Sequence, residues 1–255
     1  MVITVGNISL SFHRAVGAIT RRVLESHGHT VRTVEAAHEE LFRRQAADEI
    51  DVLVSAWLPA SHGAYLSRYE DRAIVLSALY HPYCVWAVPP YVPETAVAEV
   101  ADLARSDVRE RMTLGIDGIN PGAGISRFSA RIVSEYGLDR VGYRFTPGTE
   151  DGFKARVERG IAAGEWFVIP LWRPYYLNLV YGLRPLAEPK GLLGGVDAAS
   201  PIVRGAARDL IGAAALDHLN SLRLENDAVE QLDALINVDG CTPLQAADQY
   251  LGSGR

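Results

Sequence analysis

Short apolar runs alternate with stretches of helical periodicity along most of the chain. Strands are predicted at 2–5, 30–34, 50–55, 73–79, 84–88, 112–117, 141–145 and 166–171. Helices are predicted at 13–27, 36–47, 94–104, 124–136 and 149–163. From residue 198 onward the pattern indicates helices with little strand. This alternation of strand and helix is typical of the α/β class with parallel sheets.

Aromatic side chains gather after the predicted strands, where the ligands of such sheets bind. Trp57 follows the third strand and Trp172 the last one, with Tyr175 just beyond it. Tyr80 and Trp86 stand in a further aromatic-rich stretch, 79–86, that runs into the fifth strand. Indole and phenol faces attract cations, above all quaternary ammonium groups, with roughly 0.5–2 kcal/mol per contact. The pattern therefore favours a site that binds a small cation.

A glycine-rich turn follows the predicted strand at 112–117. Its residues, 121–125 (PGAGI), open a predicted helix. The free backbone N–H groups of this turn would face an anion there, supported by the helix dipole. Aromatic rings opposite a helix N-terminus suit a small zwitterion.

Each of these features also has a plain structural interpretation. A tryptophan after a strand is often part of the core, a glycine turn is often a simple connection, and His62 alone is typical of a surface or capping position. Enzyme signatures are absent from the sequence, since Gly124–Phe128 departs from GxSxG and no HExxH or phosphate-binding loop occurs. The coincidence of aromatic residues after several strands favours binding, so no catalytic residue is expected.

Composition narrows the range of partners. With 31 acidic and 25 basic residues, the chain carries a net charge of −6, which argues against nucleic acid as a binding partner. No apolar run reaches the ~18 residues that span a bilayer. The first residues (MVITVG) lack signal-peptide features, so a cytoplasmic location is expected as the sequence stands, and a periplasmic or extracellular one if a leader was removed. Cys84 and Cys241 form no cluster at metal spacing, so we expect neither a disulfide, a metal nor a cofactor.

Six segments in order resemble the substrate-binding component of glycine betaine/choline-type ABC importers. They are 24–31 (LESHGHTV), 51–62 (DVLVSAWLPASH), 85–92 (VWAVPPYV), 121–125 (PGAGI) with 135–138 (EYGL), 172–176 (WRPYY) with 186–191 (LAEPKG), and 242–248 (TPLQAAD). The resemblance covers nearly the whole chain. It implies a two-lobe, hinged fold of the type II periplasmic-binding-protein kind, with the ligand in the interlobe cleft. The first lobe would hold 1–88 and 176–255, and the second 89–175.

The resemblance also implies roles for individual residues. In this family, tryptophans at positions matching Trp57 and Trp172 hold the quaternary ammonium group. A histidine matching His62, and backbone N–H groups matching Gly124 and Ile125, hold the carboxylate. The neutral histidine ring suffices, because it need only donate a hydrogen bond.

One part of the pattern departs from the family. Many members carry a further tryptophan near the end of the first strand, where this chain has Phe12 and His13. With Tyr80, Tyr83 and Trp86 as extra aromatic side chains, together with His13 and His81, we expect a different pocket.

The sequence thus predicts a monomeric binding protein for a small quaternary ammonium or zwitterionic solute, such as glycine betaine, that serves an ABC permease. Two alternatives remain open. One is a cytoplasmic enzyme on the same fold, in which His13, His62 and His81 supply acid–base chemistry. The other is a ligand sensor that signals to a partner protein.

Overall fold

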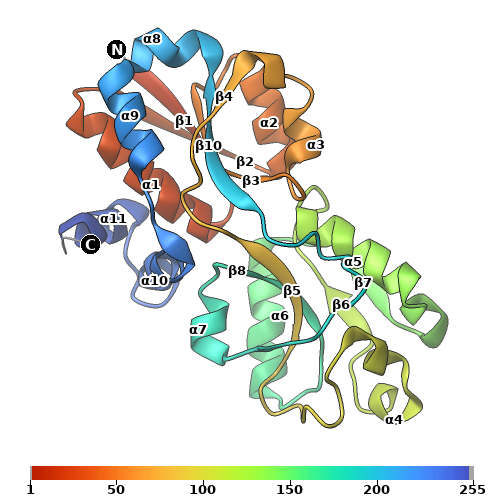
Figure 1. Ribbon diagram of the computed structural model, residues 1–255. Coiled ribbons are helices and arrows are strands. Elements are labelled where there is room, and N and C mark those ends of the chain that lie inside the picture. Colours follow the sequence, from red (N-terminus) through yellow and green to blue (C-terminus); the bar gives the residue numbers. More distant parts are fainter. Residues whose placement is uncertain (1, 253–255) are drawn as a thin grey trace. The chain divides into compact units, whose positions relative to one another are not determined.

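The computed structural model describes residues 2–252, and the chain forms two compact units. Unit 1 comprises the residues up to Pro82, the short segment Pro174–Tyr176 and the residues from Asp197 onward. Unit 2 comprises Tyr83–Arg173 and Leu177–Val196. The chain therefore passes between the units four times, and each unit has its own sheets and helices (Figure 1).

Unit 1 is built on a five-stranded mixed sheet in the order β2-β1-β3-β10-β4. Its strands are β1 (Val2–Ile8), β2 (Thr30–Ala36), β3 (Val52–Leu58), β4 (Ala73–Val75) and β10 (Ala198–Arg204). Its helices are α1 (Ser11–Ser26), α2 (His38–Ala46), α3 (Gly63–Leu66), α8 (Arg208–Ile211), α9 (Ala213–Ser221), α10 (Glu225–Asn237) and α11 (Pro243–Gly252), with 3-10 turns at Glu70–Arg72 and Gly205–Ala207. The first three strands pair in parallel, and β10 runs antiparallel to both of its neighbours.

Helices cover both faces of this sheet, which explains why β1 and β3 are buried along almost their whole length. Successive residues of β1 show the two faces. A side chain at Gly6 would meet Leu41 of α2, whereas Asn7 packs against Gly17 of α1. Helix α1 ends where Gly28 adopts a positive φ of 82°, which returns the chain to β2.

Unit 2 contains a three-stranded antiparallel sheet, β8-β5-β9, and a parallel pair, β6-β7. The strands are β5 (Tyr83–Val88), β6 (Gly115–Asp117), β7 (Arg144–Thr146), β8 (Ile169–Arg173) and β9 (Arg184–Pro185). The helices are α4 (Ser106–Arg109), α5 (Gly124–Glu135), α6 (Glu150–Ala162) and α7 (Leu177–Tyr181), with 3-10 turns at Val100–Ala104 and Leu138–Val141. The long helices α5 and α6 start where they were predicted to start, within about one residue.

Three sequence predictions differ from the structure. The expected helix at 94–104 is wrong: a turn leads into the 3-10 segment Val100–Ala104, whose start is fixed by reciprocal caps between Glu99 and Asp102. The region after residue 198 was expected to be helical, yet it begins with β10, which lies between β3 and β4. The sheets were expected to be parallel, whereas β10 and the whole β8-β5-β9 sheet pair antiparallel.

The boundaries of the two compact units differ from those of the predicted lobes. The first lobe was expected to hold 1–88 and 176–255, and the second 89–175. Residues 83–88 belong to unit 2 because β5 pairs along its length with β8. The segment Leu177–Val196 joins the same unit, since β9 pairs with β5. A hinge between two lobes stays a prediction.

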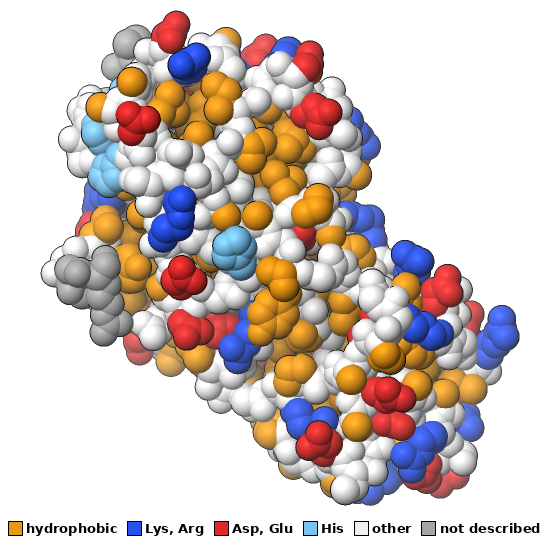
Figure 2. Space-filling model, viewed as in Figure 1, with side chains coloured by type: hydrophobic (Ala, Val, Ile, Leu, Met, Phe, Trp, Pro, Cys, Tyr) orange, Lys and Arg blue, Asp and Glu red, His pale blue; other side chains and the backbone are white. Residues whose placement is uncertain are grey.

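The surface agrees with the charge balance of the sequence. On the face shown in Figure 2, Lys and Arg side chains lie among Asp and Glu and form no continuous basic area. Within residues 2–252, no helix has both the length and the apolar character that crossing a bilayer requires.

Candidate ligand-binding site

Five aromatic side chains gather in unit 1, and we call them the aromatic cluster: Phe12, His13, Trp57, Tyr80 and Tyr175. The ring centroid of Phe12 lies 5.5 Å from that of Trp57 and 6.1 Å from that of Tyr175. His13 and Trp57 are 6.0 Å apart. The indole N–H of Trp57 donates to the hydroxyl of Tyr80 at 3.1 Å. All five side chains are buried, and Trp57 retains 6% exposure.

The fold brings these residues together at the carboxyl ends of neighbouring strands. Phe12 and His13 lie in the first turn of α1, directly after β1, and Trp57 is near the end of β3, which pairs with β1. Tyr80 reaches the sheet through a bridge to Ala199 of β10. The placement follows the rule that ligands of α/β sheets bind beyond the strand ends.

A bulge in β3 sets the direction of the chain just before Trp57. The pairing with β10 shifts at this point, and Ser55 has a φ of 51°, which is unusual for a residue with a side chain. The Ser55 hydroxyl lies 2.8 Å from Nδ1 of His13. Backbone strain of this kind concentrates at ligand sites. Here the contact between Ser55 and His13 ties α1 to β3 beside the Trp57 indole.

The aromatic cluster carries no charge of its own near neutral pH. Burial, and then the neighbouring His38, hold the pKa of His13 well below its ordinary value of 6.5, so the ring is neutral. Burial raises the pKa of Tyr80, whose hydroxyl therefore stays protonated. A cation placed against Trp57 consequently meets ring faces without electrostatic repulsion from His13.

His62 is held in one tautomer by the backbone. Its Nδ1 accepts a hydrogen bond from the N–H of Trp57 at 2.9 Å, so the proton of the neutral ring is on Nε2. The ring lies 6.3 Å from the indole of Trp57. A neutral imidazole with the proton on Nε2 is the form that can donate to a carboxylate, as the sequence interpretation requires.

Three buried carboxylates, which the sequence interpretation missed, accept hydrogen bonds from the backbone beside Trp57, His62 and Tyr175. Asp197 accepts from the N–H groups of Ala60 and Ser61, at 2.7 and 3.1 Å, in the loop that joins Trp57 to His62. On α10, the carboxylates of Glu230 and Asp233 accept from the backbone N–H groups of residues 175 and 176, at 3.3 and 2.9 Å. Two acids three residues apart on an otherwise apolar helix face were the available signal. An isolated aspartate such as Asp197 offers none.

Unit 2 carries the remaining predicted residues. Trp172 lies in β8, with its ring centroid 5.4 Å from that of Phe153 of α6. Gly124 and Ile125 form the first turn of α5, where N–H groups have no carbonyl partner within the helix. The N-cap residue Ala123 adds no side-chain acceptor. The sequence predicted an anion site at this helix start, and binding of an anion there stays a prediction.

The four tryptophans differ in what surrounds them. Trp86 is completely buried in unit 2 and donates from its indole N–H to the hydroxyl of Ser129 at 2.9 Å, so its placement favours a packing role. The guanidinium of Arg111 lies 3.5 Å from the centre of the Trp166 ring. Trp57 and Trp172 are the two that the family resemblance assigns to the ligand, and they belong to different units.

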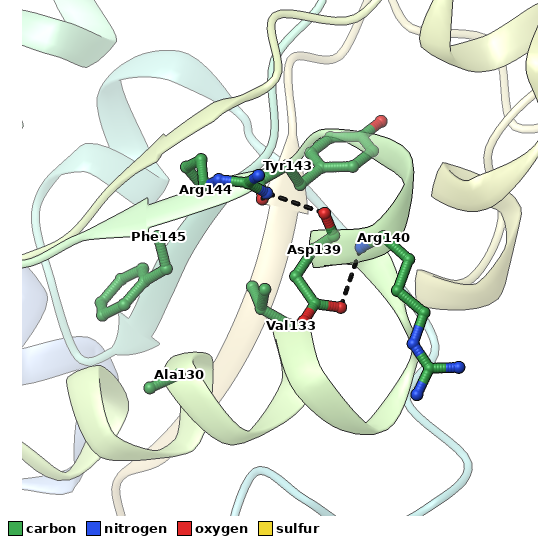
Figure 3. A pocket seen from close by; sticks show the side chains of 7 residues that line it. All are labelled: Ala130, Val133, Asp139, Arg140, Tyr143, Arg144 and Phe145. Carbon is green, nitrogen blue, oxygen red and sulfur yellow. Dashed lines mark hydrogen bonds between the residues drawn. The ribbon is translucent and has the colours of Figure 1, made fainter.

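A pocket of about 470 Å³ opens on unit 2 but has a different lining (Figure 3). It is lined by Ala130, Val133, Asp139, Arg140, Tyr143, Arg144 and Phe145. The Arg144 guanidinium donates to the backbone carbonyls of Asp139 and Tyr143, both at 2.7 Å, and the side chain of Asp139 accepts from the N–H of Arg140. The Arg144 guanidinium and the Asp139 carboxylate thus bond to the backbone of the pocket wall, and the pocket includes none of the predicted site residues.

The structure therefore divides the ten predicted site residues between the units. Unit 1 holds the aromatic cluster and His62, which lie together. Unit 2 holds Trp86, Gly124, Ile125 and Trp172. That one ligand contacts residues from both units stays a prediction.

A model of one protein family matches residues 2–253, almost the entire chain, and its description is "Substrate binding domain of ABC-type glycine betaine transport system". The chain belongs to this family. A curated relative, the glycine betaine/carnitine transport binding protein GbuC of Listeria monocytogenes serotype 1/2a (strain 10403S), is 22% identical over 148 residues. That match spans 58% of this chain and about half (49%) of the relative.

Solved structures establish the fold. A lactococcal OpuAC, in a closed conformation complexed with glycine betaine, superposes with a TM-score of 0.87 at 23% identity, covering 99% of this chain and 96% of its own. An ABC-transporter choline-binding protein in complex with choline gives a TM-score of 0.85 at 19% identity, covering 99% and 88%. The predicted two-lobe, type II fold class and the family resemblance are confirmed. The members of this family and the superposed structures are binding proteins rather than enzymes.

Proposed function

We propose that this chain is the ligand-binding component of an ABC importer and that it binds a small quaternary ammonium solute of the glycine betaine kind. The observation that carries the proposal is the uncharged aromatic cluster around Trp57. Rings that surround a cation without a competing positive charge are the usual receptor for groups such as trimethylammonium, which offer no hydrogen-bond donor.

Unit 2 would supply the second half of the recognition. Trp172 would add an indole face, and the N–H groups of Gly124 and Ile125 would hold the carboxylate of a betaine. His62 would donate from Nε2 to the same carboxylate. Support for this arrangement comes from relatives of the same family, whose structures contain glycine betaine or choline.

The proposal extends to the partners of the chain. We expect a monomer that delivers its solute to an ABC permease without altering it chemically, so recovered ligand should be intact. A binding component of this kind works outside the cytoplasmic membrane, and cell fractionation of a tagged chain tests that location.

Titration calorimetry with glycine betaine, carnitine and choline tests the aromatic contacts. Trp57→Leu and Trp172→Leu should each weaken binding about five- to thirtyfold, because each removes a cation–π contact of roughly 1–2 kcal/mol. Trp57→Phe should retain most of the affinity because it keeps a ring. Trp166→Leu is the matched control and should bind normally. Unchanged affinity in both Trp57→Leu and Trp172→Leu would refute the proposal.

A second pair of variants tests the carboxylate donors. Gly124→Pro removes one N–H at the first helical position, where proline is tolerated, and the φ of −68° and ψ of 144° at Ala123 suit the residue before a proline. Gly124→Ala keeps that N–H. We expect Gly124→Pro to weaken glycine betaine but not choline, which has no carboxylate. Equal losses for both ligands would count against a carboxylate site at α5.

A further inference from the structure

Two histidines from distant parts of the sequence meet at the surface of unit 1. His27 is the C-cap of α1, and His218 lies in the last turn of α9, 191 residues further along the chain. Nε2 of His27 and Nδ1 of His218 are 3.1 Å apart. The two rings stand edge to face, with centroids separated by 5.3 Å. Figure 2 shows histidine side chains at the surface beside α9.

The distance between these nitrogens matches that of two ligands on one metal ion. Imidazole nitrogen binds Zn²⁺ at about 2.0–2.1 Å, and other divalent first-row ions similarly. Two such bonds at an angle between about 90° and 109° place their nitrogens about 2.9–3.4 Å apart. In the hydrogen-bonded pair one ring donates and the other accepts; the donating ring would bind a metal ion as a neutral ligand once its proton has moved to its other ring nitrogen.

Neighbouring contacts hold the two elements together. His29 donates from Nε2 to the backbone carbonyl of Ile211, at 2.9 Å, which ties the chain just after α1 to the end of α8. Helix α9 begins two residues later and packs on α1. Most of the ordering that a two-residue site requires is therefore present before an ion arrives.

The pair is open to solvent on both rings, so an ion can enter and water can complete its coordination. Across residues 2–252, no group of three or more His, Cys, Asp or Glu side chains is arranged to hold a metal. The site would therefore have two protein ligands, and it suits ions that bind imidazole strongly. Affinity for such ligands rises from Ni²⁺ to Cu²⁺ and falls again at Zn²⁺.

We propose that His27 and His218 form a surface binding site for a divalent transition-metal ion, with Cu²⁺ bound more tightly than Ni²⁺ or Zn²⁺. The site lies on elements other than those that carry the aromatic cluster, apart from α1, whose opposite end contributes Phe12 and His13. The proposal is independent of the solute that the protein binds.

Titration of the purified protein with Cu²⁺ in a non-coordinating buffer tests the proposal by calorimetry and electron paramagnetic resonance. We expect one tight equivalent, hyperfine coupling to two nitrogens, and at least about tenfold weaker binding in His27→Ala and in His218→Ala, because each variant loses chelation. His81→Ala removes an exposed histidine elsewhere and should leave this affinity unchanged. Equal copper affinity in the wild type and both pair variants, or coupling to a single nitrogen, would overturn the proposal.

Discussion

Asp197 offers the most specific test of how the loop between Trp57 and His62 is held. Its carboxylate accepts from the N–H groups of Ala60 and Ser61, and the loop carrying these residues joins Trp57 to His62. Asp197→Ala removes both acceptors. Asp197→Asn keeps one carbonyl oxygen and turns an amide NH₂ toward the other N–H.

The expected cost follows from the burial of the two donors. Leaving a buried N–H without an acceptor costs about 1–3 kcal/mol. Ser61 is buried, whereas Ala60 is half-buried and can recover part of the loss from water. Asp197→Ala should therefore lower the free energy of unfolding by about 2–4 kcal/mol, and Asp197→Asn by about half as much. Both variants should also weaken binding of glycine betaine, because the geometry between Trp57 and His62 loosens.

Urea unfolding measures the stability change, and hydrogen exchange of the Ala60 and Ser61 amides locates it. Protection of these two amides should fall sharply in Asp197→Ala. Asp71→Ala, which alters an exposed carboxylate, is the control and should stay within about 0.5 kcal/mol of the wild type. If Asp197→Ala is equally stable and its Ala60 and Ser61 amides remain protected, the carboxylate does not hold the loop.

Two further predictions concern the interior of unit 1. Because the pKa of His13 is lowered in the folded state, the unfolded chain binds more protons than the folded one below about pH 6.5. The free energy of unfolding should therefore fall as the pH drops from 6.5. His13→Gln should flatten this slope in urea unfolding at pH 5–7. A Cβ at Gly17 would overlap Oδ1 of Asn7, so Gly17→Ala should destabilise the fold by about 1–3 kcal/mol. Gly115→Ala, whose Cβ meets no atom within 4 Å, is the control and should melt near the wild-type temperature.

The parts of the site that lie on regular elements could be predicted from the sequence. Gly124 opens a strongly periodic helix, as predicted, whereas Trp57, which was expected to follow the strand at 50–55, lies inside β3 near its end. The proximity of Phe12 to Trp57 follows from the parallel pairing of β1 with β3. These features depend on local patterns, which a single sequence displays.

The remaining features depend on contacts between distant residues. The segment Ala198–Arg204 contains Pro201 and is a strand only because β3 and β4 pair with it on both sides, with Pro201 at the bulge where a ladder hydrogen bond is not required. The carboxylate of Asp197 acts on a loop 136 residues earlier in the chain. Neither produces a periodic signal.

The central claim is that aromatic faces recognise the positive charge of the solute and not only its shape. Glycine betaine and 3,3-dimethylbutanoate have the same shape and carboxylate, but a carbon atom replaces the cationic nitrogen in the second. Calorimetry with the wild-type protein should show binding of glycine betaine and at least about thirtyfold weaker binding of the uncharged-headgroup analogue, since two cation–π contacts of roughly 1–2 kcal/mol each are lost. Equal affinity for the two compounds would contradict the account.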